Sequence, residues 1–127
     1  MRIAVVGPCA AGKSMLVERL RALGYEARQV SQEHSGVPTM WRMLHPPDVL
    51  IYLDASLPTI ARRREIDWGE EYLLELRNRL RHARQHCDFY LQTDGLSEEE
   101  VLEKVLAFLK SRLISATENT EDTGEKI

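Results

Sequence analysis

Residues 7–14 read Gly7-Pro8-Cys9-Ala10-Ala11-Gly12-Lys13-Ser14 and match the pattern G-x-x-x-x-G-K-[ST]. An apolar run, Ile3-Ala4-Val5-Val6, leads directly into the first glycine. After the lysine, apolar residues recur at helical spacing until Gly24, which is typical of an amphipathic helix that ends there. A glycine-rich loop of this pattern between a strand and a helix is typical of phosphate binding. The stretch therefore predicts a loop that holds a nucleoside triphosphate.

Each fixed position of the loop has a chemical task. Gly7 and Gly12 let the backbone curl, so that successive N–H groups point at phosphate oxygens near a helix N-terminus. Lys13 is expected to reach the β- and γ-phosphates, and the Ser14 hydroxyl is expected to ligate Mg²⁺. The predicted cofactors are therefore a nucleoside triphosphate, with ATP as the expected one and the preference over other triphosphates left open, and Mg²⁺. The loop residues predicted to contact them are Gly7, Ala10, Ala11, Gly12, Lys13, Ser14 and Met15.

Composition limits the other function classes. The chain has 127 residues, of which 43% are hydrophobic and 29% charged, as in an ordinary soluble domain. Its net charge of −3 is carried by the last thirteen residues, which hold four acids and one lysine, while the rest is balanced. This balance argues against a nucleic-acid or anionic-membrane partner. No stretch predicts a membrane span or signal peptide, and two cysteines make no disulfide framework, so a cytoplasmic protein is expected.

Strands and helices are predicted to alternate along the chain. The predicted strands cover 3–6, 25–30, 48–54 and 88–92, and the long helices cover 13–23, 70–86 and 97–113. Ser97 and Glu100 form an N-terminal capping signature for the last helix. The fold class is therefore α/β, a doubly wound parallel sheet of about four strands with helices on both faces. Residues 1–114 are predicted to form a nucleotide-binding domain, and 115–127 a disordered acidic tail.

Over residues 1–113 the sequence resembles the small P-loop kinases, such as nucleotide, shikimate and gluconate kinases. Three places carry the resemblance, namely the 7–14 loop, the strand at 49–54 with Arg62-Arg63-Arg64 after it, and the segment 88–101. The resemblance implies the P-loop NTPase fold, a lid after the second place, and a base-contacting turn at Thr93-Asp94-Gly95 in the third. One departure is large. The segment 24–47 is too short for the extra strand and helical insert that hold the acceptor in these kinases.

Two carboxylates are candidates for the second metal-site acid. Asp54 ends an apolar run like a Walker B aspartate, whereas Glu33 ends the preceding strand. Gln32-Glu33-His34-Ser35 is similar to the acid-Arg-Ser or acid-Arg-Tyr motif of deoxynucleoside and thymidylate kinases, with His34 in place of the arginine. The resemblance implies that such an acid works as a base or holds a metal-bound water. Glu33 and Asp54 both stay candidates, beside the alternative that they are a loop acid and a helix cap.

Arginines are concentrated between residues 62 and 84. Arginines that a lid brings over the phosphates can balance the charge of a phosphoryl-transfer transition state. Arg62 is therefore predicted to contact the nucleotide, and Arg63 and Arg64 to act in catalysis. On the following helix Arg77, Arg79, Arg81 and Arg84 are expected to cover the edge of the core instead.

Two further polar features have structural interpretations. His82, His86 and Cys87 have a spacing that superficially suggests zinc, but the expectation is a solvated helix face. Trp41 is expected in the core, and Trp68 could either stack on a base or pack.

Two functions remain open at this stage. The first is an ATP-dependent kinase that transfers the γ-phosphoryl group to an unknown small-molecule acceptor. Lys13, Glu33, Arg63 and Arg64 would act in catalysis, and Ser14 with Glu33 or Asp54 would hold the metal. The alternative is a nucleotide-binding or slow NTPase module that acts as a switch or binds a partner, without an acceptor. The arginine triplet favours the kinase, and the short segment 24–47 favours the module.

Overall fold

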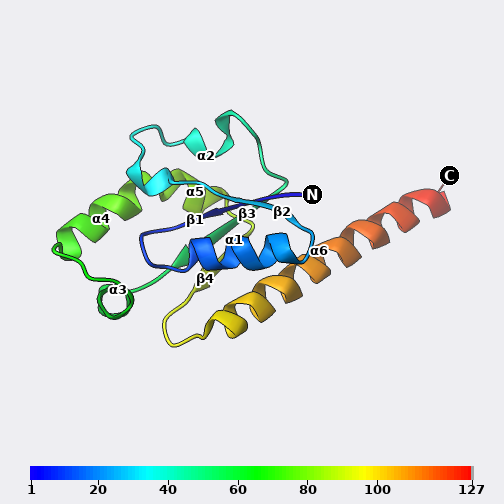
Figure 1. The fold of residues 1–127 in the computed structure, drawn as a ribbon. Helices are drawn as coiled ribbons and strands as arrows, with labels where there is room; N and C mark the ends of the chain where they lie inside the picture. The colour runs from blue at the N-terminus through cyan, green and yellow to red at the C-terminus, as the bar shows by residue number, and fades with distance from the viewer. Residues whose placement is uncertain (127) are drawn as a thin grey trace.

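The computed structural model describes the backbone of residues 1–126 and the side chains of residues 1–113. Four parallel strands form one sheet in the order β2-β1-β3-β4 (Figure 1). Their bounds are β1 (Arg2–Val6), β2 (Glu26–Gln29), β3 (Val49–Asp54) and β4 (Phe89–Gln92). All four predicted strands are confirmed, as is the α/β class.

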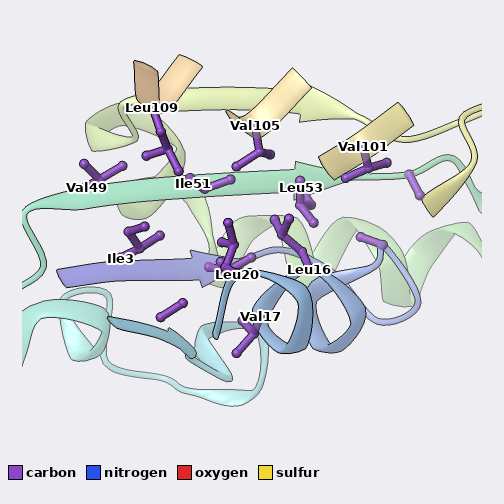
Figure 2. Close-up of a cluster of buried hydrophobic side chains, with 14 of the residues drawn as sticks. Ile3, Leu16, Val17, Leu20, Val49, Ile51, Leu53, Val101, Val105 and Leu109 are labelled. Carbon is purple, nitrogen blue, oxygen red and sulfur yellow. The ribbon is translucent and has the colours of Figure 1, made fainter. Parts of the chain in front are cut away.

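One face of the sheet is covered by α1 (Lys13–Ala22) and α6 (Glu98–Lys126). Figure 2 shows how their side chains meet those of the strands. Leucines and valines of both helices are fully or almost fully buried there because the apolar positions recur at the spacing of one helix face. The labelled members of this cluster are Ile3, Leu16, Val17, Leu20, Val49, Ile51, Leu53, Val101, Val105 and Leu109.

The opposite face is covered by α2 (Met40–Met43) and α5 (Arg81–His86). Trp41, Leu80 and Ala83 pack there against alternate residues of β1 and β3. Since β3 is buried at every position, its continuous apolar run reflects a strand covered on both faces. Helices on both faces and Trp41 in the core are therefore confirmed.

The helix predicted over 70–86 is two helices, α4 (Glu70–Arg79) and α5, which meet at Leu80. The Leu80 N–H bonds to the carbonyls of both Leu76 and Arg77, which tightens the last turn of α4. The carbonyl of Arg79 accepts from the Gln32 side chain. The helix therefore bends where a side chain from another segment takes one of its backbone groups.

The start of α6 follows its predicted signature. Glu100 N–H donates to Ser97 Oγ, and Ser97 N–H donates to Glu100 Oε1, both at 3.1 Å. These two reciprocal bonds make a capping box. The backbone of α6 is helical to Lys126, whereas the predicted acidic tail, 115–127, lies outside the described side chains and stays a prediction. Among the described residues, no helix combines the length and apolar character needed to cross a membrane.

The strand order locates a crevice between β1 and β3. The chain leaves β1 toward β2 at one edge and leaves β3 toward β4 at the other edge. At such a reversal the loops after two neighbouring parallel strands separate, and ligands of open α/β sheets bind there. The 7–14 loop follows β1, and the 3-10 turn η1 (Gln32–His34), α3 (Leu57–Arg63) and the 93–97 turn follow the other three strands. All predicted site residues therefore lie at one edge of the sheet.

Candidate functional site

The 7–14 loop is folded tightly against β3. Gly7 has φ +149°, and a Cβ built on it would lie 1.9 Å from the carbonyl oxygen of Leu53. Gly12, the N-cap of α1, has φ +109°, which a residue with a side chain rarely adopts. Both glycines of the motif are thus required by the backbone, one by a close approach and one by a left-handed turn. The N-terminus of α1 faces the space that the loop encloses.

The Lys13 side chain lies inside this loop. Its Nζ donates to Gly7 O at 2.5 Å, to Pro8 O at 3.1 Å and to Glu33 Oε2 at 2.6 Å. The side chains of Lys13 and Glu33 are only 5% and 4% exposed. The predicted lysine and one of the two candidate acids therefore form a buried ion pair. Any anion that recruits Lys13 must compete with these three acceptors.

The turn η1 places Glu33 opposite the loop. Gln32 is fully buried, and its side chain donates to Val37 O at 2.8 Å and accepts from Trp41 N at 2.8 Å. Arg79 donates to the Glu33 carbonyl at 3.2 Å. These bonds fix the turn from both sides, so the Glu33 carboxylate is held by buried neighbours. Its Oε1 is buried, and no donor among the described residues reaches it.

Oxygen donors for a magnesium ion are available beside the lysine. The Ser14 hydroxyl donates to Gln29 Oε1 at 2.7 Å. Ser14, Gln29 and Glu33 all line the same cavity. Mg²⁺ prefers hydroxyl, amide and carboxylate oxygens, and the unpartnered Oε1 of Glu33 is one such ligand. The residues present thus fit the predicted cation.

The cavity beside the loop, called here the loop cavity, has a volume of about 440 Å³. It brings together most of the predicted phosphate and catalytic residues. Those that line it are Ala10, Gly12, Lys13, Ser14, Met15, Glu33, Arg63 and Arg64. Gly7 does not line this cavity and is buried against β3.

A second cavity of about 330 Å³, the Thr93 cavity, adjoins the first and shares Gly12, Met15 and Arg63 with it. Arg63 Nη1 donates to Ala10 O at 3.0 Å and to Thr93 Oγ1 at 2.8 Å, and Nη2 donates to Thr93 O at 2.7 Å. The buried Thr93 hydroxyl also lies 2.9 Å from Ala11 O. Arg63 and Thr93 thus clamp the loop from the side of β4.

A third cavity of about 400 Å³, the Trp68 cavity, adjoins the loop cavity and shares Cys9, His34 and Arg64 with it. Trp68 and Tyr72 make an edge-to-face contact in its wall, with ring centroids 5.1 Å apart. Its remaining lining residues are Glu65, Ile66 and Asp67. The loop cavity therefore shares residues with each of the other two cavities, which share none with each other.

Asp54 lies outside these cavities. Its Oδ1 accepts from Ala55 N at 2.9 Å and from Arg77 at 3.2 Å, and its Oδ2 accepts from Tyr90 Oη at 2.8 Å. Burial, with the bond to Asp54 second, raises the pKa of Tyr90 to about 12. The structure therefore brings Glu33, and not Asp54, together with Lys13 and Ser14.

Three further predicted residues lie beside the cavities without lining them. Arg62 donates to Thr59 Oγ1 at 3.1 Å. Asp94 accepts from Ser56 N at 2.9 Å, and although burial acts to raise the Asp94 pKa, this bond and others from Ser56 and Thr59 hold it below its ordinary value. Gly95 turns the chain there with φ +72°. This turn therefore links β4 to the start of α3.

Three of the four arginines of α4 and α5, namely Arg77, Arg79 and Arg84, make contacts within the fold. Arg77 bonds to Asp54, Arg79 makes an i,i+4 ion pair with Glu75 at 2.6 Å, and Arg84 lies 3.9 Å from the centre of the Tyr90 ring. His82 and His86 stack with ring centroids 4.1 Å apart. Burial, then His86, lowers the pKa of His82, which accepts a hydrogen bond from Trp41.

Several site residues were not found by sequence reasoning. Gln29 touches Ser14 from the end of β2, Gln32 fixes η1, and Tyr72 lines the Trp68 cavity. Gln29 and Tyr72 belong to no motif, and Gln32 was quoted only as the neighbour of Glu33. The role of each becomes visible only when strands and loops are placed side by side. The sequence did single out His34, because His34 stands where the acid-Arg-Ser or acid-Arg-Tyr motif has its arginine.

No family model matches this chain, and a comparison with curated proteins finds no similar sequence.

Proposed function

We propose that this chain is an ATP-dependent kinase for a small molecule, with the nucleotide along the 7–14 loop and the acceptor in the Trp68 cavity. One observation carries the proposal. The loop cavity shares Gly12, Met15 and Arg63 with the Thr93 cavity, and a different set, Cys9, His34 and Arg64, with the Trp68 cavity. The base and the acceptor would thus occupy different cavities on either side of the phosphates, and the acceptor hydroxyl would attack the terminal phosphate opposite its leaving oxygen.

Each residue would have a defined task in this arrangement. Ser14 and Glu33 would hold Mg²⁺, which supplies charge neutralisation at the phosphates when bound. Lys13 would leave Glu33 and bind phosphate oxygens, and Arg63 would keep the loop closed through Ala10 and Thr93. Arg64, which lines both the loop cavity and the Trp68 cavity, would meet the phosphoryl group in transfer.

The Trp68 cavity would replace the acceptor insert that the segment 24–47 is too short to contain. Its wall combines two aromatic rings with Arg64, Glu65 and Asp67. Such a wall suits a small hydroxyl-bearing molecule with a planar or apolar part. Glu33 lines the loop cavity and would accept the hydroxyl proton or order a metal-bound water.

One observation favours the second candidate function, a nucleotide-dependent switch. Lys13 is paired with Glu33, which belongs to the turn η1. If phosphates recruit Lys13, the bond that ties η1 to the loop is lost, and the segment after β2 could shift. A bound nucleotide would then act as a conformational signal without an acceptor.

A screen for phosphorylated products tests both candidates. Purified protein is incubated with Mg·ATP and a metabolite library, and products and free phosphate are measured in parallel. A phosphorylated product whose formation is lost in Trp68→Ala, but kept in the exposed control Leu44→Ala, supports the kinase. Free phosphate without product supports the switch or NTPase module. If no phosphorylated product forms and calorimetry detects no nucleotide binding, both candidate functions are overturned.

A further inference from the structure

Cys9, Glu33 and His34 form a cluster of three different metal-ligating side chains. Cys9 belongs to the 7–14 loop, whereas Glu33 and His34 belong to the turn η1. One ligand atom of each residue lies within 4.8 Å of the other two. Two segments that are 24 residues apart in the sequence thus present a thiol, a carboxylate and an imidazole to the same point. We propose that these three residues bind Zn²⁺ and so tie the loop to η1.

The geometry of the cluster is close to that of a zinc site. Cys9 Sγ and His34 Nε2 are 3.8 Å apart. A tetrahedral zinc with its usual Zn–S and Zn–N bond lengths would hold these two atoms about 3.6 Å apart. Cys9 and His34 therefore need to move by only a few tenths of an ångström to share one ion, and the ligand atom of Glu33 lies within 4.8 Å of both.

The Glu33 carboxylate provides a second and independent observation. Its Oε2 accepts from Lys13, whereas its buried Oε1 has no donor among the described residues. A buried polar atom without a partner is costly, and a metal ion is one of the recognised ways to satisfy it. In the chain without nucleotide, the oxygen that Lys13 leaves free is thus available as a zinc ligand, and Mg²⁺ in the proposed nucleotide complex would be an alternative occupant of the same oxygen.

The donor set selects the ion. Thiolate, imidazole and carboxylate together are typical ligands of Zn²⁺, while Mg²⁺ prefers oxygen ligands alone. On binding, the Cys9 thiol releases its proton to water and forms the Zn–S bond. The neutral His34 ring donates its Nε2 lone pair and keeps its proton on Nδ1. Because His34 is exposed and Cys9 half-buried, the ion can enter from solvent.

Three protein ligands leave the fourth position of a tetrahedral zinc to water. This open arrangement is that of catalytic rather than structural zinc sites.

The proposal does not depend on nucleotide binding, since zinc alone is the probe. The other group that could compete for zinc is His82, His86 and Cys87. Its ligand atoms do not form a comparable cluster among the described residues.

Calorimetry with ZnCl₂ on the full chain, without nucleotide, tests the site. Wild-type protein should bind one Zn²⁺, and Cys9→Ser and His34→Ala should each weaken binding by roughly tenfold or more, since even loss of a supporting partner has an effect of that size. The matched controls Cys87→Ser and His86→Ala should bind as wild type. Thermal melts of the metal-free variants check that each is folded. Binding that is absent in wild type, or that survives both substitutions, would overturn the proposal.

A measurement on wild-type protein keeps the test independent of any variant. Both cysteines are free and half-buried, so their alkylation can be compared by mass spectrometry in one sample. Zinc should slow iodoacetamide labelling of Cys9 by roughly tenfold or more, while labelling of Cys87 stays unchanged. Zinc should also slow amide exchange over residues 8–11 and 32–34 together. Protection of Cys87 instead of Cys9, or of neither, would contradict a site at Cys9, Glu33 and His34.

Discussion

The ammonium of Lys13 lies 2.6 Å from Glu33 Oε2, and both side chains are buried. This contact joins the loop after β1 to the turn after β2, so it belongs at once to the stability of the fold and to the chemistry of the site. The carbonyls of Gly7 and Pro8 occupy the other protons of the ammonium. A buried pair of this kind is held in place because each charge would otherwise lack a partner.

The first prediction concerns the stability of this pair. Lys13→Met leaves the Glu33 carboxylate buried without a cation, so the free energy of unfolding should fall by on the order of 3 kcal/mol. The double variant Lys13→Met/Glu33→Gln removes both charges and should regain most of that loss. Urea unfolding of Lys13→Met, Glu33→Gln and the double variant measures the interaction energy of the pair as a double-mutant cycle. A single variant as stable as wild type would mean that the pair does not contribute.

The second prediction concerns the close approach of Gly7 to β3. In Gly7→Ala the new Cβ would meet Leu53 O, a backbone atom that cannot move aside, at a φ that alanine rarely adopts. The free energy of unfolding should fall by roughly 3 kcal/mol or more. Gly36→Ala is the matched control, because a Cβ there meets open space, and it should stay within about 0.5 kcal/mol of wild type. Equal melting curves for both variants would contradict the close approach.

The sheet could be predicted because its signals are local. The apolar runs at 3–6 and 48–54 are long enough to identify buried strands, and Ser97 with Glu100 fixes the start of α6. The break between α4 and α5 could not be predicted, since it depends on the Gln32 side chain from a distant segment. Periodicity along one helix contains no information about such a partner.

The candidate site was predicted in the same uneven way. The geometry of the 7–14 loop could be predicted from its own residues, because its backbone requires glycine at two positions of the motif. The choice between Glu33 and Asp54 stayed open, because it depends on which of β2 and β3 directs its end toward Lys13. The structure shows which of the two acids is close to Lys13. Glu33 contacts Lys13, whereas Asp54 contacts Arg77. The cluster at Cys9 likewise needs two loops side by side.

The third prediction separates the two acids by function. If Glu33 holds a metal-bound water or acts as the base, Glu33→Gln should lower turnover by roughly 10²-fold or more while ATP binding is largely kept. Asp54→Asn should affect turnover less, because Asp54 bonds to Arg77 and Tyr90 outside the cavities. Steady-state rates and calorimetry with ATP measure the two effects separately. A larger loss of turnover in Asp54→Asn would transfer the role to Asp54.

The fourth prediction concerns alkaline pH. Burial raises the pKa of Tyr90 from 10.0 to about 12, so between these values the folded protein keeps a proton that the unfolded chain has lost. The stabilisation is complete below pH 10 and should be lost as pH rises toward 12. Burial also raises the pKa of Tyr52, which acts in the same direction. Urea unfolding at pH values on either side of 10 should therefore show a smaller decrease for Tyr90→Phe than for wild type. Equal decreases would show that Tyr90 does not contribute.

The two arginines at the end of α3 have different surroundings, although they are neighbours in the sequence. Arg63 donates to Ala10 O and to both oxygens of Thr93, so its guanidinium is engaged in holding the loop. Arg64 lines the loop cavity and the Trp68 cavity, and no acceptor among the described residues binds its guanidinium. In the proposed kinase Arg63 would therefore position the nucleotide, whereas Arg64 is available to a ligand.

The last prediction follows from this difference. Arg63→Ala should weaken ATP binding and loosen residues 8–11, because Ala10 and Thr93 lose their common donor. Arg64→Ala should leave ATP affinity nearly unchanged but lower turnover by on the order of 10³-fold, the effect of removing an arginine that meets the transition state. ATP should protect residues 60–70 from proteolysis and amide exchange in wild type, and replacing Arg62, Arg63 and Arg64 together should remove that protection. Arg84→Ala, which changes a contact with Tyr90, is the control and should keep both turnover and protection. Full turnover and full protection in the triple variant would show that this segment is not a lid.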